Sequence, residues 1–307
     1  MKIFKNRGDI YISKSGYKSS KEEIILLSAL AVIVVLTIVF LFLLSRQYSS
    51  VKEFFAEGEV STTENLQLDE NELPKIEGKK NFLIMECSDD KEELYYVLLV
   101  EADSDSLAYK VSTLSPDMMI DNKNIFEIYS EGGGPAVHTH MMEYFGFNID
   151  YYMMFTMSDF VEFINKLGTF IYPVSDNIRF NGGTVDNEYS LRLREGENKI
   201  NGKKLSNLMR YYCKDKPDFE NANTLVLYAL IGLINENNFE KSEQLFRVFI
   251  SNATTNITVR DFENAKENLE VFSKKNADVA VYSSVAGFEN NVLNDEALHS
   301  IKGYFNN

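Results

Sequence analysis

Residues 81–114 read NFLIMECSDDKEELYYVLLVEADSDSLAYKVSTL, a stretch in which three apolar runs are separated by two short polar connections. The runs at 81–87 and 94–100 are short and bounded by charged residues, which is typical of strands buried in a sheet. The third run, 107–114, follows a turn-forming Asp-Ser-Asp-Ser segment and has the alternation of a strand. We therefore predict three consecutive strands of a central β-sheet.

Downstream of these strands, the apolar spacing changes repeatedly between that of a helix and that of a strand. Gly132-Gly-Gly-Pro135 is expected to open a helix that ends at Gly146, because Pro suits the first helical position and Gly suits the residue after the last. A second helix is expected to be capped by Ser158 and to end at Gly168. The other predicted elements are strands at 151–157 and 170–174 and helices at 202–212, 224–235, 240–251 and 259–273. This alternation predicts an α/β sandwich.

Near the N-terminus, residues 24–44 form an uninterrupted apolar run in which only Ser28 and Thr37 are polar. A helix of this length spans about 30 Å, the thickness of the hydrocarbon core of a bilayer. A cleaved signal peptide is the alternative, but its apolar core is usually about 7–15 residues and ends at a small-x-small site, which is missing here. We therefore predict one uncleaved transmembrane helix.

Charge sets the predicted orientation of this helix. Residues 1–46 contain 7 Lys and Arg and 3 Asp and Glu, whereas the whole chain has 31 basic and 46 acidic residues. Since basic flanks stay in the cytoplasm, we predict a single-pass cell membrane protein with a cytoplasmic N-terminus and an extracytoplasmic C-terminal part. The bilayer is one expected partner. The acidic exterior part argues against nucleic acid as another.

The predicted organisation follows from these boundaries. It comprises a cytoplasmic basic tail at 1–23, the transmembrane helix at 24–44, a polar acidic linker at 45–78, an extracytoplasmic domain at 79–275 and a C-terminal extension at 276–307. Within the extension, residues 279–282 are predicted as a strand and 295–305 as a short helix.

An ordered series of short motifs then resembles one family, the LytR-CpsA-Psr cell-envelope proteins, which carry the cell envelope-related transcriptional attenuator domain. Ile125-Phe-Glu-Ile-Tyr-Ser-Glu-Gly-Gly133 is similar to the family's Ile-Asn-Ala-Ala-Tyr-x-x-Gly-Gly. The series continues, in the family's order, with 145–152, 160–168, 193–196, 200–202 and Arg210. The resemblance covers roughly residues 80–272 and implies an α/β sandwich with a mixed central sheet.

The same resemblance implies a function. Active members of the family transfer glycopolymers such as teichoic acid or capsule from a polyprenyl-pyrophosphate lipid to peptidoglycan. Their chemistry uses Arg side chains to neutralise the pyrophosphate, Mg²⁺ held by carboxylates, and an apolar groove for the lipid. The partners expected on this basis are a polyprenyl-phosphate lipid or a cell-wall polymer.

This sequence departs from the family at the charged positions. The family's Arg-x-Asp pair falls on Glu93 and Tyr95, and its Pro-Arg-Asp motif retains only Asp117. Of a later Arg-x-Arg pair only Arg210 remains, and 218–224 contains no Arg where the family has several. Asp117 and Arg210 are thus the candidate catalytic residues, and Asp117 is the candidate Mg²⁺ ligand. The structural alternatives are a turn Asp and a helix Arg in an ion pair.

Two hypotheses follow from these departures. The chain is either a divergent phosphotransferase of this family or a pseudoenzyme that binds lipid, polymer or a partner protein. Convergence of Arg179, Arg192, Arg194, Arg210 or Arg247 beside Asp117 at an apolar groove would favour the enzyme. A groove filled by Tyr95, Tyr212 and Met side chains would favour the pseudoenzyme.

The remaining candidate residues are cysteines and histidines. Cys87 and Cys213 are either a disulfide or two buried thiols. His138 and His140 point to different faces of a helix, which favours surface histidines over a metal site.

Overall fold

The computed structural model describes residues 73–183, 188–284, 288–289 and 292–306. The chain divides into two units, Met1–Glu70 and Asn71–Asn307, and all described residues belong to the second. The predicted tail, transmembrane helix and most of the linker therefore lie outside the described residues. Within these residues, no helix has the length and apolar character needed to cross a membrane.

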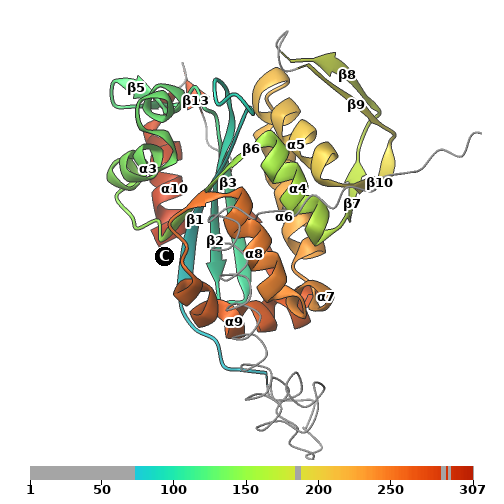
Figure 1. The fold of residues 1–307 in the computed structure, drawn as a ribbon. Coiled ribbons are helices and arrows are strands. Elements are labelled where there is room, and N and C mark those ends of the chain that lie inside the picture. Colours follow the sequence, from blue (N-terminus) through green and yellow to red (C-terminus); the bar gives the residue numbers. More distant parts are fainter. Residues whose placement is uncertain (1–72, 184–187, 285–287, 290–291, 307) are drawn as a thin grey trace, which may run out of the picture. The chain divides into compact units, whose positions relative to one another are not determined.

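A six-stranded mixed sheet forms the centre of the described unit (Figure 1). Its spatial order is β11 (Thr254–Thr255), β6 (Tyr151–Thr156), β1 (Lys79–Cys87), β2 (Leu94–Asp103), β3 (Ala108–Leu114) and β12 (Ala280–Ser283). The pairs β1–β2, β2–β3 and β11–β6 are antiparallel, and β1–β6 and β3–β12 are parallel. The three strands predicted from residues 81–114 are confirmed, and so is the mixed character of the sheet.

One face of the sheet is covered by α3 (Ile125–Phe145) and α10 (Asp295–Asn306), which pack on Leu83, Met85 and Leu99. The helix predicted to open at Gly132 begins upstream, because Asn124 and Glu127 form a reciprocal capping box. The glycines mark a kink instead: Gly133 has φ 64° and ψ −157°, outside the helical region. Gly146 ends α3 in the left-handed conformation, as predicted.

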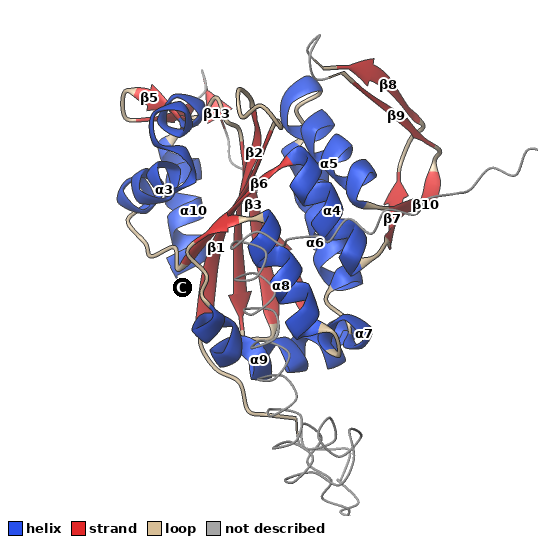
Figure 2. Ribbon diagram, in the orientation of Figure 1, coloured by secondary structure: helices blue, strands red, loops and turns tan. Residues whose placement is uncertain are grey.

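The opposite face carries a larger helical layer, seen on the other side of the sheet in Figure 2. It contains α4 (Met157–Leu167), α5 (Gly202–Arg210), α6 (Phe219–Leu233) and α8 (Ser242–Asn252), with α7 (Glu236–Phe239) and α9 (Val259–Lys274) beside them. Thr156, not Ser158, caps α4, since its hydroxyl accepts from the Asp159 N–H. Likewise, Asp218 starts α6 earlier than predicted, and α5 passes into a π-helical turn at Tyr211–Asp215.

Several strands lie outside the main sheet. Strand β7 (Phe170–Val174) is found where it was predicted but pairs with β10 (Gly196–Ile200), and β8 (Ile178–Gly182) pairs with β9 (Tyr189–Leu193). The smaller elements are β4 (Met119–Ile120), β5 (Lys123–Asn124), β13 (Phe288–Glu289), β14 (Val292–Leu293) and a 3₁₀ turn at Asn276–Asp278.

The described residues beyond 275 are part of this packed unit. β12 adds to the main sheet beside β3, close to the predicted 279–282. On α10, Ile301 and Phe305 are buried against the α3 layer, and Lys110 Nζ donates to the Tyr304 carbonyl at 2.9 Å. The segment predicted as a C-terminal extension therefore shares its core with the preceding domain.

Candidate functional site

Arg210, one of the two candidate catalytic residues, lies at the C-terminal end of α5 and is only 2% exposed. Its guanidinium carbon is 4.3 Å from the ring centroid of Tyr95 and 4.6 Å from that of Tyr189. Tyr189 is held in turn by a hydrogen bond from its hydroxyl to Asp215 Oδ2 at 2.6 Å. The cation is therefore held against two aromatic faces, an attractive arrangement for a planar guanidinium.

Glu93 supplies the nearest carboxylate to this cation. Its Oε2 is 3.7 Å from Arg210 Nη2 and 2.7 Å from Lys214 Nζ. Glu93 occupies the position where the family resemblance expects an arginine. The structure thus pairs Arg210 and Lys214 with a negative charge at the place where a phosphate clamp would add a positive one.

A second carboxylate, Glu86, is fully buried near the end of β1. The Tyr96 hydroxyl donates to its Oε2 at 2.8 Å, and the Ser206 hydroxyl donates to Oε1. Burial raises the pKa of Glu86 to about 8, because a charged carboxylate loses its hydration there. At neutral pH this group is predominantly an uncharged acid.

Asp117 lies elsewhere. Its side chain is exposed in the turn between β3 and β4, and its backbone N–H donates to Ser115 Oγ at 3.1 Å. The adjacent Met118 is buried on the α3 side of the sheet, whereas Arg210 belongs to the opposite layer. Among the described residues, no hydrogen bond or ion pair joins Asp117 to Arg210.

The donor set around Asp117 does not fit the Mg²⁺ ion that the family resemblance implies. Hard divalent cations require several oxygen ligands. No group of three or more His, Cys, Asp or Glu residues that could hold a metal occurs within the described ranges.

The other arginines do not gather beside Asp117. Arg179 on β8, Arg192 on β9 and Arg194 directly after β9 line one hollow. Arg247 lies on α8 and is exposed. The described structure therefore brings three of the candidate arginines together, but on a separate hairpin.

An apolar groove lies between the sheet and the α6, α8 and α9 helices. It consists of three adjoining cavities of about 200, 300 and 260 Å³ that share wall residues. The shared walls include Phe82, Met153, Phe249, Phe262 and Ala265. A groove with such apolar and aromatic walls is suited to binding a hydrocarbon chain.

The groove does not reach Arg210. Tyr95, Tyr96, Met209 and Tyr212 are all buried in the core between the sheet and α5, and none of them lines the three cavities. Tyr95, which packs on the guanidinium, belongs to the same core cluster as the groove residue Phe249.

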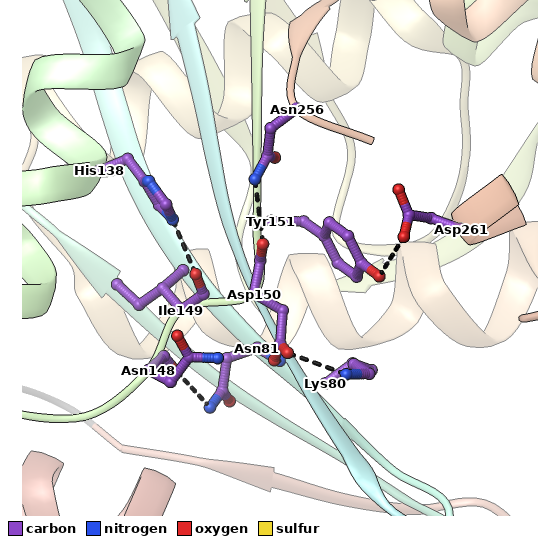
Figure 3. Close-up of polar contacts among 9 residues, drawn as sticks. All are labelled: Lys80, Asn81, His138, Asn148, Ile149, Asp150, Tyr151, Asn256 and Asp261. Atoms are coloured by element: carbon purple, nitrogen blue, oxygen red, sulfur yellow. Dashed lines mark hydrogen bonds and ion pairs between the residues drawn. The ribbon is translucent and has the colours of Figure 1, made fainter. Parts of the chain in front are cut away.

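Polar residues border the groove at the start of β1 and β6. Figure 3 shows Lys80 reaching Asp150, with Nζ 2.9 Å from Oδ1, and the Tyr151 hydroxyl reaching Asp261 Oδ1 at 3.1 Å. Lys80, Tyr151 and Asp261 also line one of the cavities. The Lys80 ammonium group, the one cation among the described residues that line this cavity, is thus already paired with the Asp150 carboxylate.

The histidines and cysteines have structural environments. His138 Nε2 is 2.7 Å from the Ile149 carbonyl oxygen (Figure 3), and His140 Nδ1 is 2.9 Å from that of Ala136. The two cysteines form no disulfide, and both are buried. Cys87 belongs to the core cluster on the α3 side of the sheet, and Cys213 belongs to the cluster on the α5 side. Burial raises the pKa of both thiols, so neither is an activated nucleophile.

Sequence reasoning missed Glu86, Lys214 and Tyr189 as members of the Arg210 environment. The sequence does point to Glu86, because it is the one charged residue in the apolar run 82–87 and is expected to be buried if that run is a central strand. Nothing in the sequence points to Tyr189 or Lys214, since only tertiary packing brings Tyr189 on β9 and Lys214 in the π-helical turn close to Arg210.

Comparisons with known proteins agree with this architecture. The model of the LytR_cpsA_psr family matches residues 62–299. Among solved structures, a protein from Eubacterium siraeum aligns with a TM-score of 0.62 at 15% identity, over 78% of this chain and 96% of its own.

Two further solved structures align with this chain over a similar length. Bacillus subtilis TagV aligns with a TM-score of 0.55 at 15% identity, over 74% of this chain and 96% of its own. TagT, solved bound to LI-WTA, aligns with a TM-score of 0.55 at 14% identity, over 76% of this chain and 91% of its own. No curated protein sequence matches. By the extent of the family match, the chain belongs to the LytR_cpsA_psr family.

Proposed function

We propose that this protein is a cell-envelope member of its family that binds the hydrocarbon chain of a polyprenyl-phosphate lipid without transferring the phosphate. The observation that carries the proposal is the closure of Arg210 between Tyr95 and Tyr189 beside Glu93, while the apolar groove is retained. The apolar groove could hold the lipid's hydrocarbon chain, as the family's chemistry requires. The set of accessible arginines that the same chemistry uses for the pyrophosphate has no equivalent around Arg210 in the described structure.

Electrostatics support the absence of turnover. A pyrophosphate brought to Arg210 would meet the Glu93 carboxylate, and repulsion between like charges is strong where water is excluded. It would also have to displace Tyr95 or Tyr189, since the guanidinium is only 2% exposed. Phosphoryl transfer depends on positioned cations, and here the cation is already neutralised and covered.

We further propose that the sequence-predicted helix at 24–44 anchors the protein in the membrane, with the folded part outside. This location would bring the groove close to its lipid. The basis is the length and flanking charge of the apolar run.

A second candidate function has one observation in its favour. Nε and Nη2 of Arg210 and the Tyr95 hydroxyl are buried without hydrogen-bond partners among the described residues. Buried donors of this kind are rare, and a role in catalysis is one explanation for them. Divergent phosphotransferase activity, in which ligand binding moves the Tyr189 hairpin aside, is therefore the alternative.

Native mass spectrometry of the full chain in detergent, incubated for hours with a polyprenyl pyrophosphate and Mg²⁺, separates the two. We expect one bound lipid whose mass does not change. Loss of a phosphate unit from the bound lipid would overturn the proposal in favour of catalysis, and absence of a lipid adduct would overturn lipid binding itself.

A matched pair of variants locates the lipid. Ala265 is exposed at the groove wall, so Ala265→Trp places an indole in the groove without opening the core. Glu267→Trp adds the same side chain at an exposed position of α9 outside the cavity linings. We expect only Ala265→Trp to abolish the adduct. Because the chain has no Trp, indole fluorescence of each variant also reports whether the lipid reaches that position.

A further inference from the structure

The outer face of the β8–β9 hairpin carries three arginines in a small area. Arg179 and Arg192 are directly opposite each other in the antiparallel register, and Arg194, directly after the end of β9, lines the same hollow. All three are exposed. Their guanidinium groups therefore lie on one solvent-facing surface, which we call the arginine face.

The rest of this face is polar and uncharged. Asn177, Asn181 and Ser190 are exposed and alternate with the arginines along the two strands. Among the described residues, the exposed carboxylates nearest to the hairpin, which are Asp176, Glu188, Glu195 and Glu197, lie outside the two strands rather than on this face. Above the strands lies a hollow of about 600 Å³ lined by the arginines and both asparagines.

The inner face of the same hairpin explains why it holds its shape. Ile178, Leu191 and Leu193 are buried in the core on the α5 side, and Tyr189 covers Arg210. Figure 1 shows β8 and β9 beyond α5, on the side of that helix away from the main sheet. The arginine face is thus a rigidly backed surface and is distinct from the groove and from Arg210.

The arrangement of these charges is costly for the free protein. Like charges directly opposite each other in an antiparallel pair destabilise it. None of the ion pairs found among the described residues involves Arg179, Arg192 or Arg194, although the whole chain has a net charge of −15. Three cations that form no ion pair with a carboxylate in the described part of so acidic a protein suit an external anion.

We infer that the arginine face binds an extended polyanion with phosphate in its repeating unit. Cross-strand neighbours such as Arg179 and Arg192 are about 5 Å apart at Cβ, and Arg192 and Arg194 are about 7 Å apart along the strand. Guanidinium forks recognise phosphate oxygens bidentately, and the asparagine amides add donors. A row of cations along a strand suits a chain of repeated charges, because each exposed contact is weak alone and the contacts add along one ligand.

The test is binding of fluorescein-labelled inorganic polyphosphate to the full chain by fluorescence anisotropy at several salt concentrations. Three phosphate contacts predict a loss of affinity of about 20- to 40-fold between about 50 and 200 mM salt. The triple variant Arg179→Gln, Arg192→Gln, Arg194→Gln should bind at least about tenfold more weakly at low salt, with a shallower salt dependence.

The matched control removes the same charge elsewhere. Arg247→Gln, Arg260→Gln, Lys275→Gln alters three exposed cations outside the hairpin and should leave binding nearly unchanged. If both triple variants lost the same affinity for polyphosphate, net charge alone would explain binding, and the proposed site on the arginine face would be wrong. An unchanged melting temperature of the hairpin variant shows that its fold is intact.

Competing ligands decide the chemistry of the polyanion. Unlabelled polyphosphate should compete, whereas polyglutamate at equal charge and neutral dextran should compete poorly or not at all. Displacement by orthophosphate at the same phosphate concentration would overturn the extended ligand in favour of a single-anion site. Equal competition by polyglutamate would overturn the preference for phosphate.

Discussion

Oε2 of Glu93 lies 3.7 Å from Nη2 of Arg210, so a carboxylate faces the arginine that the sequence predicts as a candidate catalytic residue. The two side chains are 15% and 2% exposed. A pair in this setting is largely removed from water, so each charge depends on the other more than it would at the surface.

The first prediction concerns the contribution of the Glu93–Arg210 pair to stability. Glu93→Ala should lower the free energy of unfolding by about 1–3 kcal/mol, because it leaves the buried guanidinium without its carboxylate. Urea denaturation measures the change. Glu92→Ala, at the exposed neighbouring position, is the control and should change stability by less than about 0.5 kcal/mol.

A double-mutant cycle sharpens this test. In the background of Arg210→Met, which removes the charge but retains an apolar stem against Tyr95 and Tyr189, the effect of Glu93→Ala should be much smaller. Additive effects of the two substitutions would show that the pair is not coupled.

The second prediction concerns pH. The pKa of Glu86 is raised from 4.5 to about 8 by burial, so the folded state holds a proton that the unfolded state releases. This group's contribution is fully present below about pH 4.5 and declines, by about 1.4 kcal/mol per pH unit, until the pH passes about 8.

Glu86→Gln removes that titration while keeping a hydrogen-bonding side chain. Urea midpoints of the variant should therefore decline less than those of the parent between pH 5 and pH 8. Glu92→Gln, an exposed substitution, should retain the parent's decline. Parallel profiles for the parent and Glu86→Gln would mean that Glu86 is charged in the folded protein.

The third prediction follows from the close approach of α5 to α4. A Cβ added at Gly202 would lie 2.5 Å from the backbone oxygen of Val161, a distance that requires the helices to move apart. Gly202→Ala should therefore cost about 1–3 kcal/mol, despite the better helix propensity of Ala. Lys203→Ala, exposed on the same helix, should be nearly neutral or stabilising. Thermal unfolding compares the two variants directly.

The fourth prediction tests whether the C-terminal segment belongs to the folded unit. Ile301 is fully buried on α10, so Ile301→Ala should reduce stability by about 2–5 kcal/mol. His299→Ala, exposed on the same helix, should change it by less than about 0.5 kcal/mol. If the two variants unfold alike, α10 does not share the core of the main sheet in solution.

Local patterns in the sequence were sufficient to predict much of the fold. Strands β1, β2 and β3, the glycine ends of α3 and α4, and the α/β class all follow from side-chain periodicity and capping preferences, which act over a few residues. The predicted start of α3 is wrong, because the Asn124–Glu127 capping box begins the helix upstream of the glycines. The order of motifs also identified the family.

The environment of the two candidate residues needed tertiary structure. The sequence singled out Asp117 and Arg210, but only packing shows that one is exposed in a turn and that the other is enclosed by β2, β9 and Glu93. Likewise, three arginines were noted along the chain, and only the register of β8 against β9 places them on one face away from Asp117. Periodicity and capping depend on neighbours in the sequence, whereas burial, ion pairing and charge clustering depend on residues that the chain brings together from far apart.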